Sequence, residues 1–382
     1  MAGPRIGFAC VWDHPNPQKT WSYTPWNLRN AMRQFGDVID VGVEVPAKVQ
    51  LGLKVLHARR RGGRFVTTWQ QSRLTDAYFH WGLDRAVVAS GCDVVVEIGD
   101  IAPVEKPFYL YQDLSFDLLL DAQDRHGVPL PFGLTRADIE RRRDRQRGIY
   151  EKATGVLAMS HWFGQSLVDL SGLPPEKVHV IHPGRSSAAT EPPPLPERAG
   201  PRRKLLLVGR GSFTGKGGDL TLAALEILRR EVDPEITLTF AGPPEWPLET
   251  PVPDGVTFLG SIPREEVARL FDTHDLFVMP SRLEGFGIVF TEAMSRGLPC
   301  VGRDAYAMTE IIEPGVTGAL ISGDDPAELA RVIAASLADD ALYDNCAKRA
   351  PEVSSWYTWE RAGRQVVDIV TGAATPSGRH AR

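Results

Sequence analysis

Residues 204–219, KLLLVGRGSFTGKGGD, contain the pattern that decides the fold. A short and nearly continuous apolar run ends at Val208, a glycine-rich turn follows, and a helical pattern begins at Leu220. Such a run is typical of a parallel strand buried on both faces, because a strand with one face in water would alternate apolar and polar residues. The stretch therefore predicts a strand, a tight turn and a helix, the repeating unit of a doubly wound sheet.

The same alternation of apolar runs with helical patterns extends over nearly the whole chain. The other runs are IGFACVW (6–12), CDVVVEIG (92–99), PFYLYQ (107–112), GVLAMS (155–160), VHVIHPG (178–184), ITLTFAG (236–242), VTFLG (256–260), DLFVMPS (275–281), LPCVG (298–302) and TGALI (317–321). Strands that alternate with helices imply right-handed βαβ units. Both halves show the pattern, so we predict an α/β fold of two tandem doubly wound, Rossmann-like domains.

A proline-rich stretch marks the boundary between these domains. Residues 185–203, RSSAATEPPPLPERAGPRR, have no apolar periodicity and cannot form a core, which is typical of a linker. The alternative is a long surface loop within one domain. We therefore predict an N-terminal domain over 1–184 and a C-terminal domain over 204–354. The small polar residues 372–382 predict a frayed tail.

The composition excludes several classes of protein. The chain has 382 residues, of which 43% are hydrophobic and 24% charged, and these values exclude wholesale disorder, collagen and coiled-coil rods. The formal net charge of −5 gives no support for nucleic-acid binding. No apolar run approaches the ~18 residues of a membrane span, and the first residues lack a signal-peptide pattern, so we predict a cytoplasmic protein.

The cysteines and histidines predict no metal site. Cys10, Cys92, Cys300 and Cys346 lie far apart in the sequence, so buried free thiols are expected. None of the histidines has the spacing of a metal-ligand pair.

Two basic clusters and one aromatic loop have alternative interpretations. The clusters are HARRRGGR (57–64) and IERRRDRQR (139–147), the second on a helical pattern that begins near Thr135. Such a helix presents either a solvated face or a surface that docks to an anionic membrane or acceptor. Trp21, Tyr23 and Trp26 follow the first strand. Aromatic rings there can stack on a ligand such as a sugar, or simply pack the loop onto the sheet.

Two cationic side chains bracket the glycine-rich turn of 208–219. Glycines let backbone N–H groups approach an anion, and the following helix start favours negative charge. The guanidinium of Arg210 can donate two parallel N–H bonds, and the ammonium group of Lys216 provides a compact positive charge. This combination suits a diphosphate. The spacing matches neither the P-loop nor the dinucleotide fingerprint.

A second loop carries two carboxylates. In PSRLEGFGIVFTEAMSRGLPCVG (280–302), Glu284 lies in the loop after a strand, and Glu292 lies in the first turns of a helix that ends near Gly297. Carboxylates beside an anion-binding helix start suit the hydroxyls of a sugar or ribose, although a carboxylate in such a loop is more commonly a helix cap.

These segments together resemble the retaining family-4 glycosyltransferases (glycosyl transferases group 1) of the GT-B fold. SRLEGFGIVFTEAM resembles the E-x7-E signature, and VGR with KGG (208–218) resembles the Arg/Lys diphosphate motif. VHVIHPG (178–184) and GSIPREEVARLFDTHDLFVMPS (260–281) resemble the end of the N-terminal domain and the segment whose loop meets the donor base. SWYTWERAGRQVVDIV resembles the C-terminal helix, over 355–371, that crosses back to the N-terminal domain.

The resemblance implies a set of site residues. Arg210 and Lys216 would bind the donor diphosphate, Glu284 the transferred sugar and Glu292 the donor ribose. The remaining donor contacts would come from Gly209, Ile262, Gly285, Phe286, Gly287, Ile288 and Val289. The N-terminal domain would bind the acceptor, for which Trp21, Tyr23, Trp26, Gln112 and Asp113 are the candidates.

The chain departs from the family pattern at four places. One is YAMTE (306–310), which stands where the family usually has a glycine pair before a glutamate, with Glu310 kept. Five residues instead of four separate Arg210 from Lys216. The loop DHPNPQKTWSYTP (13–25) has no double glycine, and Gln112 and Asp113 stand where many members carry a histidine.

The resemblance implies a retaining transferase that moves a sugar from a nucleotide-diphosphate sugar to an acceptor hydroxyl by same-face displacement. No metal and no cofactor are expected, because cations and backbone N–H groups would stabilise the departing diphosphate. The acceptor is a small molecule, a glycan or a lipid-linked molecule, and peripheral membrane contact through the basic helix stays open. The alternatives are a non-catalytic nucleotide-sugar binding module and another GT-B enzyme such as a sugar-nucleotide epimerase.

Overall fold

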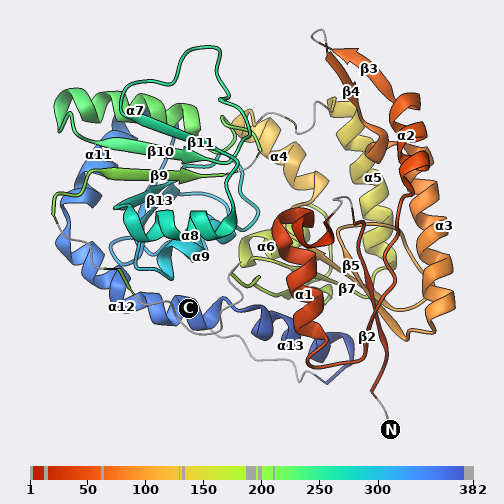
Figure 1. The fold of residues 1–382 in the computed structure, drawn as a ribbon. Helices are drawn as coiled ribbons and strands as arrows, with labels where there is room; N and C mark the ends of the chain where they lie inside the picture. The colour runs from red at the N-terminus through yellow and green to blue at the C-terminus, as the bar shows by residue number, and fades with distance from the viewer. Residues whose placement is uncertain are drawn as a thin grey trace. The chain divides into compact units, whose positions relative to one another are not determined.

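The computed structural model consists of two compact units, each built on a six-stranded parallel sheet (Figure 1). Unit 1 is Met1–Gly184 with Trp359–Arg382, and unit 2 is Arg185–Thr358. The structure describes residues 3–12, 16–61, 64–128, 130, 134–185, 195–196, 200–209 and 211–373. Most of the predicted linker 185–203 and of the tail 372–382 therefore lies outside the described residues. The predicted α/β fold of two doubly wound domains is confirmed.

The sheet of unit 1 has the strand order β2-β1-β5-β6-β7-β8. These strands are β1 (Ile6–Ala9), β2 (Val38–Asp40), β5 (Val94–Ile98), β6 (Phe108–Gln112), β7 (Gly155–Ala158) and β8 (Val178–Val180). Its helices are α1 (Thr24–Met32), α2 (Ala47–Leu56), α3 (Arg73–Ser90), α4 (Phe116–His126), α5 (Arg136–Lys152), α6 (His161–Asp169) and α13 (Trp359–Val370). The chain builds outward from β1 in both directions, so right-handed crossovers place helices on opposite faces of the sheet.

The sheet of unit 2 has the strand order β11-β10-β9-β12-β13-β14. These strands are β9 (Lys204–Val208), β10 (Thr237–Ala241), β11 (Val256–Gly260), β12 (Leu276–Val278), β13 (Cys300–Arg303) and β14 (Gly318–Ile321). Its helices are α7 (Gly218–Glu231), α8 (Arg264–Thr273), α9 (Ile288–Met294), α10 (Met308–Ile311), α11 (Pro326–Ala338) and α12 (Asp340–Trp356). The sheet again builds outward in both directions, from the central strand β9.

The apolar runs form the cores as their pattern predicts. Leu205, Leu206 and Leu207 of β9 are fully buried because helices cover both faces of a parallel sheet. All four cysteines are buried and none forms a disulfide, which confirms that prediction. Within the described residues, no helix is both long and apolar enough to cross a bilayer.

Three local elements differ from the sequence-based expectation. The edge strand β2 was not among the predicted apolar runs, because it has only three residues and ends in an exposed aspartate. The basic cluster 57–64 contributes to an antiparallel hairpin of β3 (Ala58–Arg61) and β4 (Arg64–Thr67), which the sequence analysis did not predict. The predicted helix 355–371 is interrupted: α12 runs to Trp356, and α13 begins at Trp359. The carbonyl of Tyr357 accepts a hydrogen bond from the N–H of Arg185 at 2.8 Å instead of continuing a helix.

The arginines of α5 are held by carboxylates of unit 1. Arg142 lies 2.8 Å from Asp76 of α3, and Arg147 lies 2.6 Å from Asp117 of α4. Their partners come from other helices, so the sequence could not reveal them. Arg141 and Arg147 nevertheless remain 42% and 45% exposed, so α5 keeps a partly solvated face, as one interpretation of the charge pattern predicted.

Helix α13 packs against α1 at one glycine of unit 1. A Cβ atom on Gly363 would lie 2.7 Å from the backbone carbon of Ala31 and from the backbone nitrogen of Met32. Real Cβ atoms do not approach backbone so closely, so the two helices touch only because position 363 has no side chain.

We predict that Gly363→Ala destabilises the protein by about 1–3 kcal/mol, because the added methyl group pushes α13 away from α1. Thermal and chemical denaturation measure the effect. Gly148→Ala is the matched control, since a Cβ atom on Gly148 of α5 would meet no atom within 4 Å. This second substitution should raise stability by up to about 1 kcal/mol. Equal effects of the two substitutions would contradict the close packing.

Candidate functional site

The loops that follow β9 and β12 leave the sheet of unit 2 side by side and then diverge. Strand β9 pairs with both β10 and β12, and the chain builds outward from these central strands in opposite directions. Ligands of open α/β sheets bind in the crevice outside the carboxyl ends of two such strands. The loops concerned are 209–217 and 279–287, which carry most of the residues that the sequence analysis selected.

The two loops are in direct backbone contact. Gly217 has a φ of 74°, in the left-handed region that favours glycine, and a Cβ atom there would lie 2.6 Å from the carbonyl oxygen of Pro280. The N–H of Arg282 donates to the carbonyl of Gly215 at 2.8 Å. The glycine-rich sequence of the first loop is therefore needed for this approach.

Lys216 and Glu284 form an ion pair across these loops. The Lys216 Nζ lies 2.7 Å from Glu284 Oε2, and the two side chains are 24% and 11% exposed. The hydroxyl of Ser281 donates to the same carboxylate oxygen at 3.2 Å. Five residues instead of the usual four separate Arg210 from Lys216. With this spacing Lys216 points at Glu284, the carboxylate predicted to bind the transferred sugar.

The stem of Lys216 passes over Gly209, where a Cβ atom would lie 3.2 Å from Lys216 Cγ. The small residue at position 209 makes room for the lysine, and its contact with the donor stays a prediction. Arg210, the second predicted cation, lies outside the described residues.

A buried arginine that the sequence analysis missed supports the second loop. Arg303 ends β13, and its guanidinium donates to the carbonyls of Ser281 at 3.0 Å and Pro280 at 3.2 Å. It also pairs with Asp324 at 2.7 Å. Its position at the end of an apolar run, in LPCVGR, was the available signal. Arg303 holds the backbone that carries Glu284.

The short helix α9 is preceded by Gly287, whose φ of 86° again favours glycine. A Cβ atom there would lie 2.7 Å from the ring of Phe290. Phe286 is buried and packs edge-on against the ring of Tyr357 at 5.8 Å, so a ligand can meet only its backbone. Gly285 is buried, whereas Ile288 and Val289 are half-buried.

Glu292 lies among arginines of unit 2. Its carboxylate is 3.9 Å from the guanidinium of Arg264, at the start of α8. Burial lowers the pKa of Arg185 below its usual value, and the charge of Glu292 opposes that shift. Ile262, the predicted contact to the donor base, is half-buried two residues before Arg264.

The candidate acceptor residues of unit 1 fall into two environments. Trp21 and Tyr23 end a short 3₁₀ helix with positive φ values of 38° and 69°, and Trp21 stays exposed. Trp26 packs edge-on against Trp12 and lies over the guanidinium of Arg29. That contact favours the alternative in which this aromatic residue packs the loop onto the sheet.

Gln112 and Asp113 end strand β6 of unit 1. Gln112 is buried, and its side-chain oxygen accepts a hydrogen bond from the hydroxyl of Tyr150 at 2.8 Å. This contact gives Gln112 a structural role. Asp113 is half-buried.

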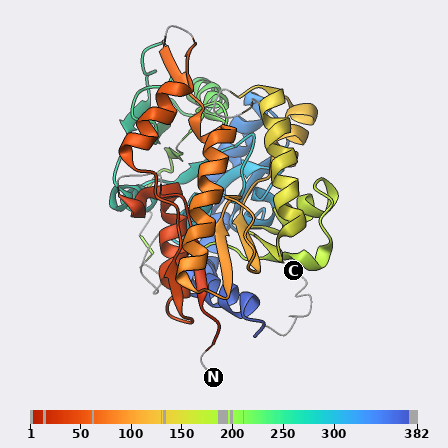
Figure 2. The ribbon, with the colours of Figure 1, turned by 90° about the vertical axis from the view of Figure 1, so that its right-hand side faces the viewer.

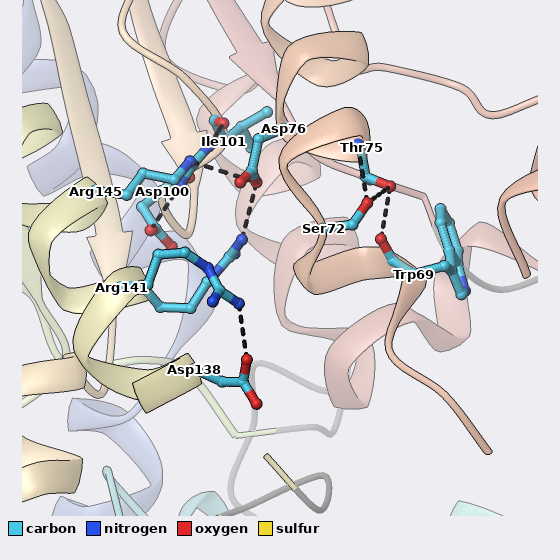
Figure 3. Close-up of polar contacts among 10 residues, drawn as sticks. Trp69, Ser72, Thr75, Asp76, Asp100, Ile101, Asp138, Arg141 and Arg145 are labelled. Atoms are coloured by element: carbon cyan, nitrogen blue, oxygen red, sulfur yellow. Dashed lines mark hydrogen bonds and ion pairs between the residues drawn. The ribbon is translucent and has the colours of Figure 1, made fainter. Parts of the chain in front are cut away.

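The loop after β5 is held from two sides in unit 1. Arg145 of α5 binds both Asp76 and Asp100 (Figure 3), and it donates to the carbonyl of Ile101. On the other side, the buried carboxylate of Glu97 accepts the N–H groups of Ile101 at 3.0 Å and Ala102 at 3.3 Å. The second oxygen of Glu97 has no hydrogen-bond partner among the described residues.

Comparison with known proteins connects this geometry to a family. Residues 195–353 match the family model "Glycosyl transferases group 1". Residues 195–353 of this chain are therefore similar to the domain that defines the group 1 glycosyl transferases. The matched region includes both loops of the unit 2 crevice. The narrower assignment to family 4 stays a prediction.

One curated relative and two solved structures extend the comparison. D-inositol 3-phosphate glycosyltransferase 1 of Catenulispora acidiphila is 29% identical over 249 residues, which cover 60% of this chain and 59% of the relative. The match therefore spans about three fifths of the relative's length. Sucrose-phosphate synthase of Thermosynechococcus elongatus superposes with a TM-score of 0.72 at 18% identity, covering 97% of this chain and 99% of that one. Anabaena HepE in complex with UDP and glucose gives 0.62 at 17% identity, covering 97% and 100%. These structural likenesses show the GT-B fold.

We predict that Glu97 makes the protein less stable as the pH rises. Burial raises the pKa of Glu97 from 4.5 to about 8. The folded state therefore holds more protons than the unfolded state within that window, and the free energy of unfolding falls as the pH increases through it. Glu97→Gln removes this dependence and should gain about 2–4 kcal/mol relative to wild type between pH 5 and pH 8.

Chemical denaturation at the two pH values measures this difference. Glu235→Gln is the matched control, because Glu235 is exposed and its substitution should shift stability equally at both pH values. A Glu97→Gln protein whose stability relative to wild type does not change with pH would show that Glu97 is charged in the fold.

Proposed function

We propose that the chain transfers a sugar from a nucleotide-diphosphate sugar to an acceptor hydroxyl with retention of the anomeric configuration. The observation that supports this most directly is the Lys216–Glu284 ion pair, which lies where β9 and β12 end in a group 1 glycosyltransferase domain. The solved structure of HepE contains UDP and glucose, and the relatives are named as glycosyltransferases. Both facts favour a sugar nucleotide as the donor.

The ion pair explains how a carboxylate can stand beside a diphosphate. An isolated carboxylate would repel the phosphate, but Lys216 offsets the charge of Glu284 at 2.7 Å. When the donor binds, the three N–H bonds of the ammonium group allow Lys216 to contact a phosphate oxygen while it stays near Glu284. The carboxylate is then available to accept a hydroxyl of the transferred sugar.

The proposed chemistry is mainly electrostatic. As the bond to the sugar breaks, negative charge develops on the departing diphosphate, and a cation already in place stabilises that charge without rearranging. Same-face displacement would let the leaving phosphate accept the proton of the acceptor hydroxyl. In this proposal Lys216, with Arg210 as the second predicted cation, makes a metal and a cofactor unnecessary.

Glu292 is the proposed ligand of the donor ribose. Its side chain is about one-fifth exposed, and Arg264 lies 3.9 Å away. A carboxylate held by a nearby guanidinium can still accept two hydroxyl hydrogen bonds, because each oxygen has two lone pairs. The cytoplasmic location of the reaction stays a prediction from the sequence.

The test begins with a thermal-shift screen of UDP-, GDP-, ADP- and dTDP-sugars, since a bound donor raises the melting temperature. The donor that binds is then incubated with and without candidate acceptors, with inositol phosphate first because of the relatives' names. Release of nucleotide diphosphate that an acceptor accelerates supports a transferase. Binding without turnover would indicate a non-catalytic module, and conversion of the donor without an acceptor would indicate an epimerase or a related enzyme. NMR of the product's anomeric carbon tests retention, and activity in EDTA tests metal independence.

We predict that Lys216→Ala lowers turnover by about 10²–10³-fold, because the developing charge loses a preorganised cation. Lys204→Ala is the matched control. Lys204 is exposed at the start of β9, the strand that precedes the loop of Lys216, and should be dispensable for turnover. Lys216→Ala should also lower the affinity for the nucleotide diphosphate. This loss should occur both when Lys216→Ala is the only substitution and when it is combined with Glu284→Gln. An affinity loss that disappears in the Glu284→Gln background would mean that Lys216 only neutralises Glu284.

We predict that Glu292→Ala weakens donor binding by roughly 1.5–3 kcal/mol, the cost of a lost hydrogen bond to a charged group. Calorimetry with the nucleotide diphosphate measures it. Glu284→Gln should instead reduce turnover more than nucleotide affinity, because Glu284 faces the sugar. Unchanged affinity of the Glu292→Ala protein, at an unchanged melting temperature, would remove Glu292 from the site.

A further inference from the structure

Large apolar side chains remain exposed on one part of unit 1. In the described part of the chain, most of these residues lie between positions 49 and 88. Those on α2 and on the following hairpin are the most prominent: Leu51 is 64% exposed, Val55 69%, Leu56 66% and Phe65 80%. Contiguous exposed apolar side chains on a folded protein indicate a surface that contacts something else. We call α2 together with the strands β3 and β4 the α2–hairpin surface.

The apolar residues of α2 lie on its outer side. Leu53 is the one buried residue of the helix, so it marks the side that packs on the protein. Leu51 and Val55 are four residues apart and share a face that points away from Leu53. Amphipathic helices usually bury their apolar face, but the wider apolar face of α2 is exposed to solvent.

The hairpin continues this surface. Phe65 pairs with Arg60 across the two strands, so the two side chains lie on the same face. The hydroxyl of Thr67 donates to the carbonyl of Lys54 at 3.2 Å and ties the hairpin to the end of α2. In Figures 1 and 2 the hairpin projects from the body of unit 1 next to α2.

The charge of this segment opposes that of the chain. No Asp or Glu occurs between Glu44 and Asp76, whereas that interval contains seven Lys and Arg residues in a protein of net charge −5. In the part of the chain that the structure describes, no carboxylate pairs with Lys48, Lys54 or Arg60. The arginines of α5 have such partners, so the two basic segments differ in kind.

We propose that the α2–hairpin surface docks the protein onto an anionic lipid bilayer. The exposed apolar side chains would enter the boundary between headgroups and acyl chains, while the surrounding cations bind lipid phosphates. The long stems of lysine and arginine lie along apolar surface with the charge at the headgroups. This inference goes beyond the proposed transferase activity, and its test does not depend on that activity.

Two other occupants fit the observations less well. A polyanion such as RNA binds cations but gains little from exposed leucine and valine side chains. A second protein would require apolar residues gathered in a well-packed patch with few charges at its centre. Here Lys48 and Lys54 occur among the apolar residues of α2, and Arg60 lies beside Phe65 on the hairpin. Such mixing of cations with apolar residues is typical of an interfacial membrane helix.

Co-sedimentation with vesicles tests the proposal. The full chain should bind phosphatidylcholine vesicles that contain 30% phosphatidylglycerol and not vesicles of phosphatidylcholine alone, and high salt should weaken binding. Lys48→Gln/Lys54→Gln should reduce the partition coefficient roughly 25-fold, at about fivefold per charge. Leu51→Ser/Val55→Ser should reduce it roughly tenfold or more, because the inserted apolar area is lost.

Matched controls separate this surface from general effects. Lys106→Gln/Lys348→Gln removes the same charge at exposed positions elsewhere, and Val232→Ser removes an exposed apolar side chain from unit 2. Both controls should bind like wild type, and melting temperatures confirm that every variant is folded. Three results would overturn the proposal: no binding to anionic vesicles, equal losses in controls and test variants, or an α2 change that alters only RNA binding or oligomeric state.

Discussion

The candidate site depends on one backbone contact, the approach of Gly217 to the carbonyl of Pro280. This contact brings the loop after β9 against the loop after β12, and the 2.7 Å ion pair between Lys216 and Glu284 follows from it. A side chain at position 217 would separate the loops and leave a lysine and a carboxylate in water, where each interacts weakly. Arg303 supports the same arrangement from the next strand, because it binds the carbonyl of Pro280 as well.

Unit 1 uses buried polar groups for a similar purpose. The loop after β5 runs between the carboxylate of Glu97 and the guanidinium of Arg145. Both units thus hold a loop at the carboxyl ends of central strands with charged side chains from neighbouring elements. The cost is a buried carboxyl group, because burial disfavours its charged form and raises the pKa of Glu97 to about 8. A rigid loop at this edge is what an open α/β sheet requires in order to present ligand-binding groups.

The basic segments show where sequence patterns lose information. The arginines of α5 and those around the hairpin look alike as strings of charge, yet Arg142 meets Asp76, which lies on another helix. A periodic pattern reports which face of a helix is polar, but it does not report what that face touches. The exposed apolar face of α2 was also hidden, because a helix with apolar residues on several sides is expected to be buried.

The sequence by itself determined the two parallel sheets except for the edge strand β2. It also determined the two loops that carry Lys216 and Glu284, and the helix that carries Glu292. Near-continuous apolar runs and glycine positions are local properties, so they can be read without knowing any distant neighbour. Only the tertiary structure decided that Lys216 binds Glu284, that Arg303 holds the second loop, and that Gln112 is committed to Tyr150. Each of these contacts joins residues far apart in the chain. The hydrogen bonds depend on a few tenths of an ångström in the packing of strands and helices, which no local pattern encodes.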